Sequence, residues 1–151
     1  MMNIIAYIRE SGRTKKERNG SVDAQEEHIS RYAQKRGLLI TTWIRDRDVE
    51  GTVPLKNRAN GAKLCEELKP NDSIICTEPG VLFAHPYEAA QDIKLWESMN
   101  VRVHFISLGG EVFPKYTKLL LGFLSSMAAE EMLARIQKSY RTKALLKGEG
   151  K

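Results

Sequence analysis

Short apolar runs alternate with longer amphipathic segments along most of the chain. Runs rich in β-branched residues predict buried strands over residues 3–8, 38–43, 73–77 and 101–106. The amphipathic segments between them predict helices over residues 21–36, 59–68 and 86–99. The longest polar stretch between these elements, residues 45–57, is expected to be a loop. The alternation predicts an α/β fold with three layers and a mostly parallel central sheet.

The last part of the chain departs from this alternation. Residues 116–146 contain no proline and a single glycine, Gly122, which predicts a helix roughly 45 Å long. Such a helix is longer than a domain of this size can cover, so we expect it to pack on a second copy in a homodimer or higher homo-oligomer. The expected contact residues recur at three- and four-residue spacing and are Leu120, Phe123, Leu124 and Met127. The alternative is a shorter helix with a frayed end.

Length and composition narrow the class of protein. The chain has 151 residues, of which 42% are hydrophobic and 28% charged, which is typical of one globular domain and excludes a disordered chain. We expect an α/β domain over residues 1–112 and a dimerisation helix with a basic C-terminal end over residues 113–151. Two cysteines and three histidines argue against a disulfide framework or a metal site. We expect a cytoplasmic protein without a membrane segment, metal or small-molecule cofactor.

The net charge of +5 is concentrated at one end of the chain. The last twenty residues contain six bases and one acid, so the first 131 residues sum to zero. A basic terminal segment is a plausible contact for the phosphates of DNA. The residues expected to make this contact are Arg135, Lys138, Arg141, Lys143 and Lys147. The alternative is a solvated helix end whose cations interact with the helix dipole.

Candidate chemistry lies at the end of the first strand, where ligands bind in parallel α/β folds. Strand alternation places Arg9 and Ser11 on one side and Glu10 on the other. A guanidinium beside a hydroxyl suits attack on a phosphate, because arginine holds the phosphate oxygens while serine supplies the nucleophile. This spacing alone is weak evidence, since a serine at a strand end is commonly a turn residue.

Four segments in order, AYIRESG, SVDAQEEHISRYAQKRG, RDRDVEGTVPLKNR and VRVHFISLGGEV, together resemble the catalytic domain of serine recombinases, the resolvase and invertase family. The resemblance extends from about residue 3 to residue 146. It implies that residues 1–112 are a resolvase-like catalytic domain and that residues 113–151 are its dimerisation helix, and we expect no separate DNA-binding domain. The resemblance also implies DNA recombination or integration by strand exchange through a phosphoserine link, without a metal. By resemblance Ser11 is the nucleophile, Arg9 and Arg58 hold the phosphate, and the supporting residues are Gln25, Asp46 and Glu131.

The chain also departs from the family pattern. Where the family has Leu-Asp-Arg-Leu-x-Arg after the third strand, this sequence has Gly80, Val81 and Ala84 at the aspartate and the two arginines. Met132 replaces the arginine that follows the acid in the long helix. Losing two cationic donors from a metal-free site costs about 5–8 kcal/mol, or four to six powers of ten in rate. The resemblance therefore implies a strand transferase that is weakly active or inactive.

Two other functions remain open from the sequence. The first is a non-catalytic dimerising module that modulates an active recombinase or binds DNA weakly. The second is an unrelated α/β domain of flavodoxin or response-regulator type, although the loop after the first strand lacks a glycine-rich phosphate cradle. A covalent protein–DNA adduct would separate a recombinase from the non-catalytic module.

Overall fold

The computed structural model describes residues 2–12, 20–113 and 117–149. Its sheet has the strand order β2-β1-β3-β4-β5. The strands are β1 (Ile4–Glu10), β2 (Thr42–Arg47), β3 (Ser73–Cys76), β4 (Arg102–Phe105) and β5 (Gly110–Phe113). The first four are parallel to one another, and β5 pairs antiparallel with β4. The predicted α/β fold with a mostly parallel sheet is confirmed.

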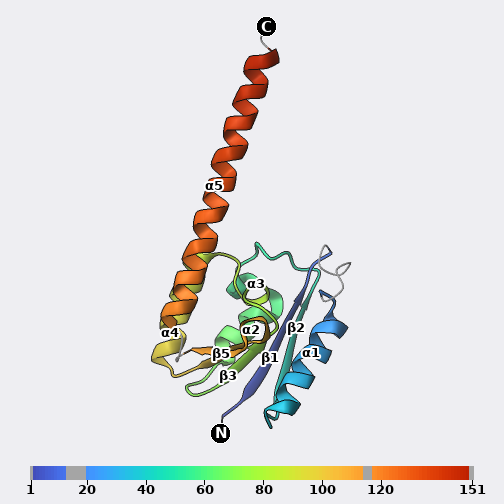
Figure 1. Cartoon of the computed structure of the whole chain (residues 1–151). Coiled ribbons are helices and arrows are strands. Elements are labelled where there is room, and N and C mark those ends of the chain that lie inside the picture. The colour runs from blue at the N-terminus through green and yellow to red at the C-terminus, as the bar shows by residue number, and fades with distance from the viewer. Residues whose placement is uncertain (1, 13–19, 114–116, 150–151) are drawn as a thin grey trace.

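Helices cover both faces of this sheet (Figure 1). One face packs on α1 (Val22–Lys35), and the other on α2 (Ala59–Glu67), the short α3 (Pro79–Leu82) and α4 (Pro86–Ser98). Single turns of 3₁₀ helix, η2 (Leu55–Asn57) and η3 (Ile106–Leu108), follow β2 and β4. Because successive strand residues point to opposite faces, Ile8 joins the core under α1, whereas Tyr7 joins the core under α2 and α4.

Local signals explain why α1 starts where the sequence predicts. The Ser21 side chain accepts a hydrogen bond from the Ala24 amide at 3.1 Å, as an N-cap does. The Glu10 carboxylate accepts another from the Val22 amide at 2.8 Å, which places a negative charge at the positive end of the helix dipole. After the helix, Gly37 adopts a left-handed φ of 65°, which ends the helix at little steric cost.

The second strand lies elsewhere than the sequence predicts. Residues 38–43 were expected to form it, but β2 begins at Thr42 and continues to Arg47, and Leu39 is 79% exposed. The strand is polar because it is an edge strand with β1 as its single neighbour. Asp46 therefore lies in a strand, and the prediction of a loop over residues 45–57 is wrong for its first three residues. The first strand is also longer than predicted and reaches Glu10.

The final helix, α5 (Thr117–Glu149), has 33 residues, so it is about 50 Å long. Its first turns lie beside α4 and β5, and the rest projects far beyond the sheet (Figure 1). The division of the chain between residues 112 and 113 stays a prediction; β5 ends at Phe113 and α5 begins at Thr117. Within the described ranges, none of the helices combines the length and apolar character that a membrane crossing requires.

Candidate active site

Arg58 is a fully buried cation at the start of α2, with 1% of its surface exposed. Its Nε donates to the Val53 carbonyl at 2.9 Å. Its Nη1 donates to the Tyr7 hydroxyl at 3.1 Å and to the Val81 carbonyl at 2.7 Å. All three acceptors are formally neutral. They hold the guanidinium in place without balancing its positive charge.

Tyr7 and Asp46 link Arg58 to the sheet. The Tyr7 hydroxyl donates to Asp46 Oδ2 at 2.7 Å, and the same carboxylate accepts the amides of Asn60 and Gly61 at 2.9 Å each. Asp46 thus caps the N-terminus of α2 from a neighbouring strand, where a negative charge is favourable. Burial raises the pKa of Tyr7 above its ordinary value, so the hydroxyl keeps its proton and remains a donor.

Arg9 occupies the end of β1, in register with Asp46 of β2. Its Nη1 donates to the Val49 carbonyl at 3.0 Å and its Nη2 to the Gly80 carbonyl at 3.3 Å. The backbone of Gly51 lies against this guanidinium, since a Cβ at that position would be 3.2 Å from Nη2. Burial, followed by the positive charge of Arg58, lowers the pKa of Arg9, which indicates that the two cations feel each other.

Neither guanidinium has a carboxylate counterion in the described part of the chain, and each keeps an open donor. Among the described residues, no aspartate or glutamate oxygen lies within 4.0 Å of either group. Arg9 Nε and Arg58 Nη2 are buried and have no hydrogen-bond partner in the part of the chain that the structure describes. Buried charges are costly unless they are paired, and buried donors are normally satisfied. The arrangement therefore favours an anion over the neutral groups that surround it.

Ser11 follows β1 directly and is 2% exposed. Gln25 fixes the backbone just before it, because its side-chain amide donates to the carbonyls of Arg9 and Gly20 at 2.9 Å each. The position suits a nucleophile at the carboxyl end of a strand. In this conformation, however, the residue is almost fully covered, so its hydroxyl is not accessible to a ligand from solvent.

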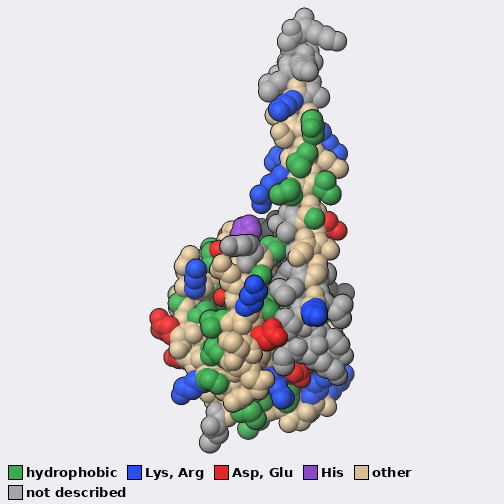
Figure 2. Space-filling model, turned by 90° about the vertical axis from the view of Figure 1, so that its left-hand side faces the viewer, with side chains coloured by type: hydrophobic (Ala, Val, Ile, Leu, Met, Phe, Trp, Pro, Cys, Tyr) green, Lys and Arg blue, Asp and Glu red, His purple; other side chains and the backbone are tan. Residues whose placement is uncertain are grey.

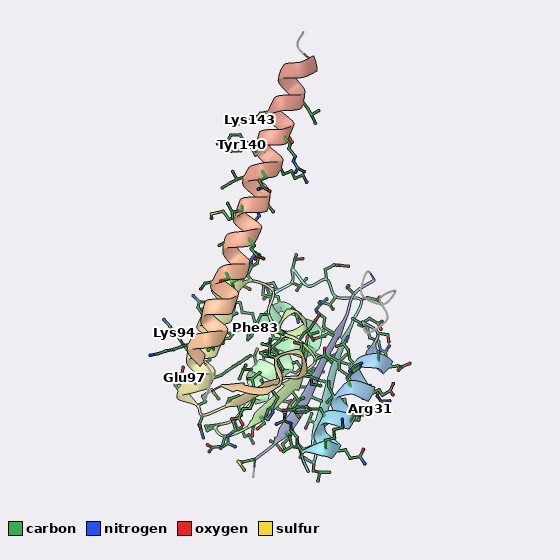
Figure 3. The ribbon with its side chains drawn as sticks, viewed as in Figure 1. Arg31, Phe83, Lys94, Glu97, Tyr140 and Lys143 are labelled. Carbon is green, nitrogen blue, oxygen red and sulfur yellow. The ribbon has the colours of Figure 1, made fainter. Side chains whose placement is uncertain are left out.

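The remaining predicted residues lie on α5. Arg135, Lys138, Arg141 and Lys143 are exposed, and Lys143 and Tyr140 extend from the projecting part of the helix (Figure 3). Figure 2 shows basic and apolar side chains together on this part of α5. The side chains of Glu131, Lys147 and the four predicted dimer residues (Leu120, Phe123, Leu124 and Met127) lie outside the described part of the structure.

The positions that depart from the family pattern form part of the core. Val81 is 4% exposed and packs in the core under α2 and α4, whereas Ala84 is half-buried. The α3 turn instead offers backbone carbonyls, those of Gly80 and Val81, to Arg9 and Arg58. These carbonyls carry no side-chain signature in the sequence. Tyr7 was also missed, although it precedes Arg9 by two residues and so shares its side of the strand.

Other reactive side chains are unsuited to catalysis. Burial raises the pKa of the Cys65 thiol to about 11, and it raises that of Cys76 still further from its usual range. Neither is therefore an activated nucleophile. His104 is buried against the Tyr32 hydroxyl, 2.7 Å from its Nδ1. The described residues include no group of three or more potential ligands placed to hold a metal ion.

Comparisons with known proteins agree with this architecture. A family model described as "Resolvase, N terminal domain" matches residues 4–151. The N-terminal catalytic domain of TP901-1 integrase is similar in structure, with a TM-score of 0.66 and 15% identity over 88% of this chain and 98% of that domain. A resolvase family site-specific recombinase from Streptococcus pneumoniae has a TM-score of 0.64 and 16% identity, over 91% of this chain and 93% of that one. A sequence comparison with curated proteins finds no significant match.

Proposed function

Because this chain belongs to the resolvase N-terminal domain family, we propose that it acts on DNA as a serine recombinase-type catalytic domain. The observation that carries the proposal is the pair of buried guanidiniums, Arg9 and Arg58, with open donors and without a carboxylate in ion-pair distance among the described residues. A backbone phosphate of DNA would supply the missing anion. Gln25, Asp46 and Glu131 are the proposed supporting residues.

The proposed reaction is a phosphoryl transfer to Ser11. The serine oxygen forms a bond to phosphorus, the bond between phosphorus and the 3′ oxygen breaks, and the DNA strand leaves as a 3′ hydroxyl. The proton lost by serine balances the proton gained by the leaving oxygen. Arg9 and Arg58 would stabilise the negative charge that gathers on the phosphate oxygens during this step. Reversal on a new strand would complete strand exchange.

We further propose that strand cleavage is slow. Neither Val81 nor Ala84 supplies a cation, so two guanidiniums must carry the stabilisation by themselves. Ser11 is also covered, and both arginines already bond to backbone carbonyls. The missing cations lower the rate because charge in the transition state stays unbalanced. The covered serine and the bonded arginines lower it because fewer molecules are able to bind phosphate.

The proposed partners are DNA and a second copy of the chain, in the cytoplasm. The exposed cations of α5 (Arg135, Lys138, Arg141 and Lys143) would contact DNA phosphates. Large apolar side chains are exposed on the same part of the helix, at Met132, Leu133, Ile136 and Tyr140. Exposed apolar stripes of this kind commonly mark protein interfaces. They support dimerisation along α5, together with the predicted contacts at Leu120, Phe123, Leu124 and Met127.

A second candidate function is a non-catalytic module that pairs with an active recombinase through α5. The covered Ser11 and the uncharged α3 turn favour this alternative. Such a module would share the helix interface and the weak DNA binding with the proposed recombinase. It would differ from the recombinase in forming no covalent bond to DNA. The two functions therefore give different results with DNA that traps a cleaved strand.

The test of cleavage uses a pool of nicked DNA duplexes of varied sequence. After cleavage near a nick the short strand dissociates, so the reaction cannot reverse and the covalent protein–DNA adduct accumulates. We expect weak binding and at most a trace of adduct, located at Ser11 by peptide mass and absent from Ser11→Ala. Ala84→Arg should increase the adduct, because a half-buried position accepts a long cationic side chain. Val81→Arg is the contrasting variant and should destabilise the fold, since it buries a charge in the core.

Two results would contradict the proposal. Rapid adduct formation by the unmodified chain would refute slow cleavage. Failure of the unmodified chain and of folded Ala84→Arg to give any Ser11-dependent adduct would favour the non-catalytic module. Circular dichroism of each variant separates loss of chemistry from loss of fold.

A further inference from the structure

Arg9 and Arg58 connect the same two segments of the chain. One segment is the loop of residues 48–53, which we call the lid, and the other is α3. Arg9 donates to Val49 in the lid and to Gly80 in α3, at 3.0 and 3.3 Å. Arg58 donates to Val53 in the lid and to Val81 in α3, at 2.9 and 2.7 Å. The two cations thus fasten the lid to α3 with four hydrogen bonds to carbonyl oxygens.

The two segments are anchored very differently. In α3, Val81 and Leu82 are buried, and so is Phe83, which follows it. These side chains belong to the core and hold the Gly80 and Val81 carbonyls in fixed positions. No residue of the lid is buried: its members are half-buried or exposed. Moving the lid therefore exposes little apolar surface, whereas moving α3 would disrupt the core.

The lid also covers the end of β1. The Val49 amide donates to the Glu10 carbonyl at 3.1 Å, one residue before Ser11. Gly51 lies against the Arg9 guanidinium, closely enough that a Cβ would be 3.2 Å from Nη2. In the closed arrangement the lid carbonyls thus occupy donors of both arginines, beside a serine that is itself 2% exposed.

We propose that the lid is displaced when phosphate binds, and that phosphate oxygens replace the Val49 and Val53 carbonyls on Arg9 and Arg58. The Gly80 and Val81 carbonyls stay in place and keep both guanidiniums oriented. This inference rests on the proposed function in that the anion is a phosphate. A phosphate offers arginine a negatively charged acceptor and often two parallel hydrogen bonds, whereas a carbonyl offers only a neutral acceptor. Phosphate would also reach the open donors and balance two buried positive charges.

Gly51 offers a way to shift the lid without substituting either arginine. In Gly51→Ala the new methyl group is tighter against Arg9 Nη2 than ordinary packing allows, so the closed lid is weakened. If a closed lid limits binding, weakening it raises the fraction of molecules able to bind and lowers the apparent Kd by the same factor. We expect phosphate to bind about two- to tenfold tighter. The matched control is Gly122→Ala in α5, where a Cβ meets nothing within 4 Å.

The experiment combines calorimetric titration with inorganic phosphate and hydrogen exchange of the full chain. Sodium chloride of equal ionic strength is the reference for exchange. The Val49 amide is the reporter, because its bond to Glu10 exists in the closed lid. We expect phosphate to speed exchange in the peptide that contains the lid, and Gly51→Ala to speed it without phosphate. Gly122→Ala should match the unmodified chain in both measurements.

Each outcome decides between the lid and the anion site. Faster exchange in the lid with phosphate, together with tighter binding by Gly51→Ala, supports the proposal. Phosphate binding that leaves exchange in the lid unchanged or slower overturns the lid but leaves the proposed function intact. No binding by the unmodified chain or by Gly51→Ala overturns the anion site, and with it both proposals.

Discussion

Positive charge appears in two regions of this molecule, and its surroundings in the two are opposite. Arg58 and Arg9 are 1% and 7% exposed at the carboxyl end of the sheet. The cations of α5, such as Arg135 and Arg141, are exposed on a helix that projects from the body. The buried pair donates to backbone carbonyls of the lid and of α3, and Arg58 also donates to the Tyr7 hydroxyl of β1. The described cations of α5 are exposed to solvent, and the structure gives them no such contacts with other described residues.

The difference teaches how each region binds a partner. A ligand of Arg9 and Arg58 must compete with hydrogen bonds that also hold the fold together. A ligand of α5 competes only with water and counterions. Under the proposed function, phosphate binding at the buried pair would therefore be coupled to a conformational change, whereas DNA binding along α5 would depend on salt concentration. Substituting the same residue type in both regions tests this contrast.

The largest effect is expected from Arg58→Leu. It leaves the Val53 and Val81 carbonyls and the Tyr7 hydroxyl without their donor. Unsatisfied buried polar groups cost about 1–3 kcal/mol each, so we expect the free energy of unfolding to fall by about 3–5 kcal/mol. Urea denaturation followed by circular dichroism measures the change.

Arg135→Leu is the matched control on α5, and its effect should be within about 0.5 kcal/mol. If Arg58→Leu does not fold, Arg58→Lys replaces it, since lysine keeps the charge but cannot reproduce the forked contacts. Equal or greater stability of either Arg58 variant would mean that the buried charge costs more than its hydrogen bonds contribute, and the contrast would fail.

Sequence patterns predicted the parts of the fold that have local causes. The start of α1 follows from Ser21 and that of α4 from Pro86, because caps act within one turn of the helix. The second strand was misplaced because the apolar run at residues 38–40 lies before the strand, where Leu38 and Ile40 pack against the core and Leu39 is exposed. The actual strand is polar, and Asp46 is accommodated there by the amides of α2, a contact between distant residues.

The site was predictable to a similar extent. The resemblance drew attention to Arg9 and Arg58, and the structure brings both to the α3 turn. It gave no sign of Gly80 and Val81 as carbonyl acceptors, since every residue has a carbonyl and only the fold decides which one faces a guanidinium. Interpreting Val81 solely as a lost arginine also missed its place in the core.

The second prediction concerns the exposed cations of α5. If around four of them meet phosphates, log affinity for duplex DNA should fall with log salt at a slope of about −3 to −4. Replacing Arg135, Lys138 and Arg141 together by glutamine should make the slope shallower by about 2.7, which weakens binding about 500-fold at 0.1 M salt if the affinity at 1 M salt is unchanged. Fluorescence anisotropy over a range of salt concentrations measures both quantities.

The control removes the same charge from the body, at the exposed residues Arg31, Lys63 and Lys94 (Figure 3 labels Arg31 and Lys94). This variant should keep the slope of the unmodified chain, because its cations lie away from the projecting helix. Sedimentation of both variants checks that the oligomeric state is unchanged. A common slope for both triple variants would show that net charge, and not α5, determines DNA binding.

The smallest effect is expected from Tyr7→Phe, which removes one hydroxyl between Asp46 and Arg58. We expect a loss of about 1–2 kcal/mol in the free energy of unfolding at neutral pH. Tyr140→Phe, at a side chain 68% exposed on α5, should change it by less than about 0.5 kcal/mol. Urea denaturation at pH 7 measures both variants.

Alkaline pH sharpens this last comparison. Because burial raises the pKa of Tyr7 in the folded chain, the unfolded chain ionises first as pH rises past about 10. The folded state then loses stability relative to the unfolded state, by about 1.4 kcal/mol at pH 11 for this one group. Tyr7→Phe has no such group, so its deficit in free energy of unfolding relative to the unmodified chain should shrink towards zero near pH 11. All other groups titrate in both chains and cancel in this difference. A deficit that stays constant from pH 7 to pH 11 would show that Tyr7 ionises equally in both states, and that the hydroxyl between Asp46 and Arg58 is not held as the structure places it.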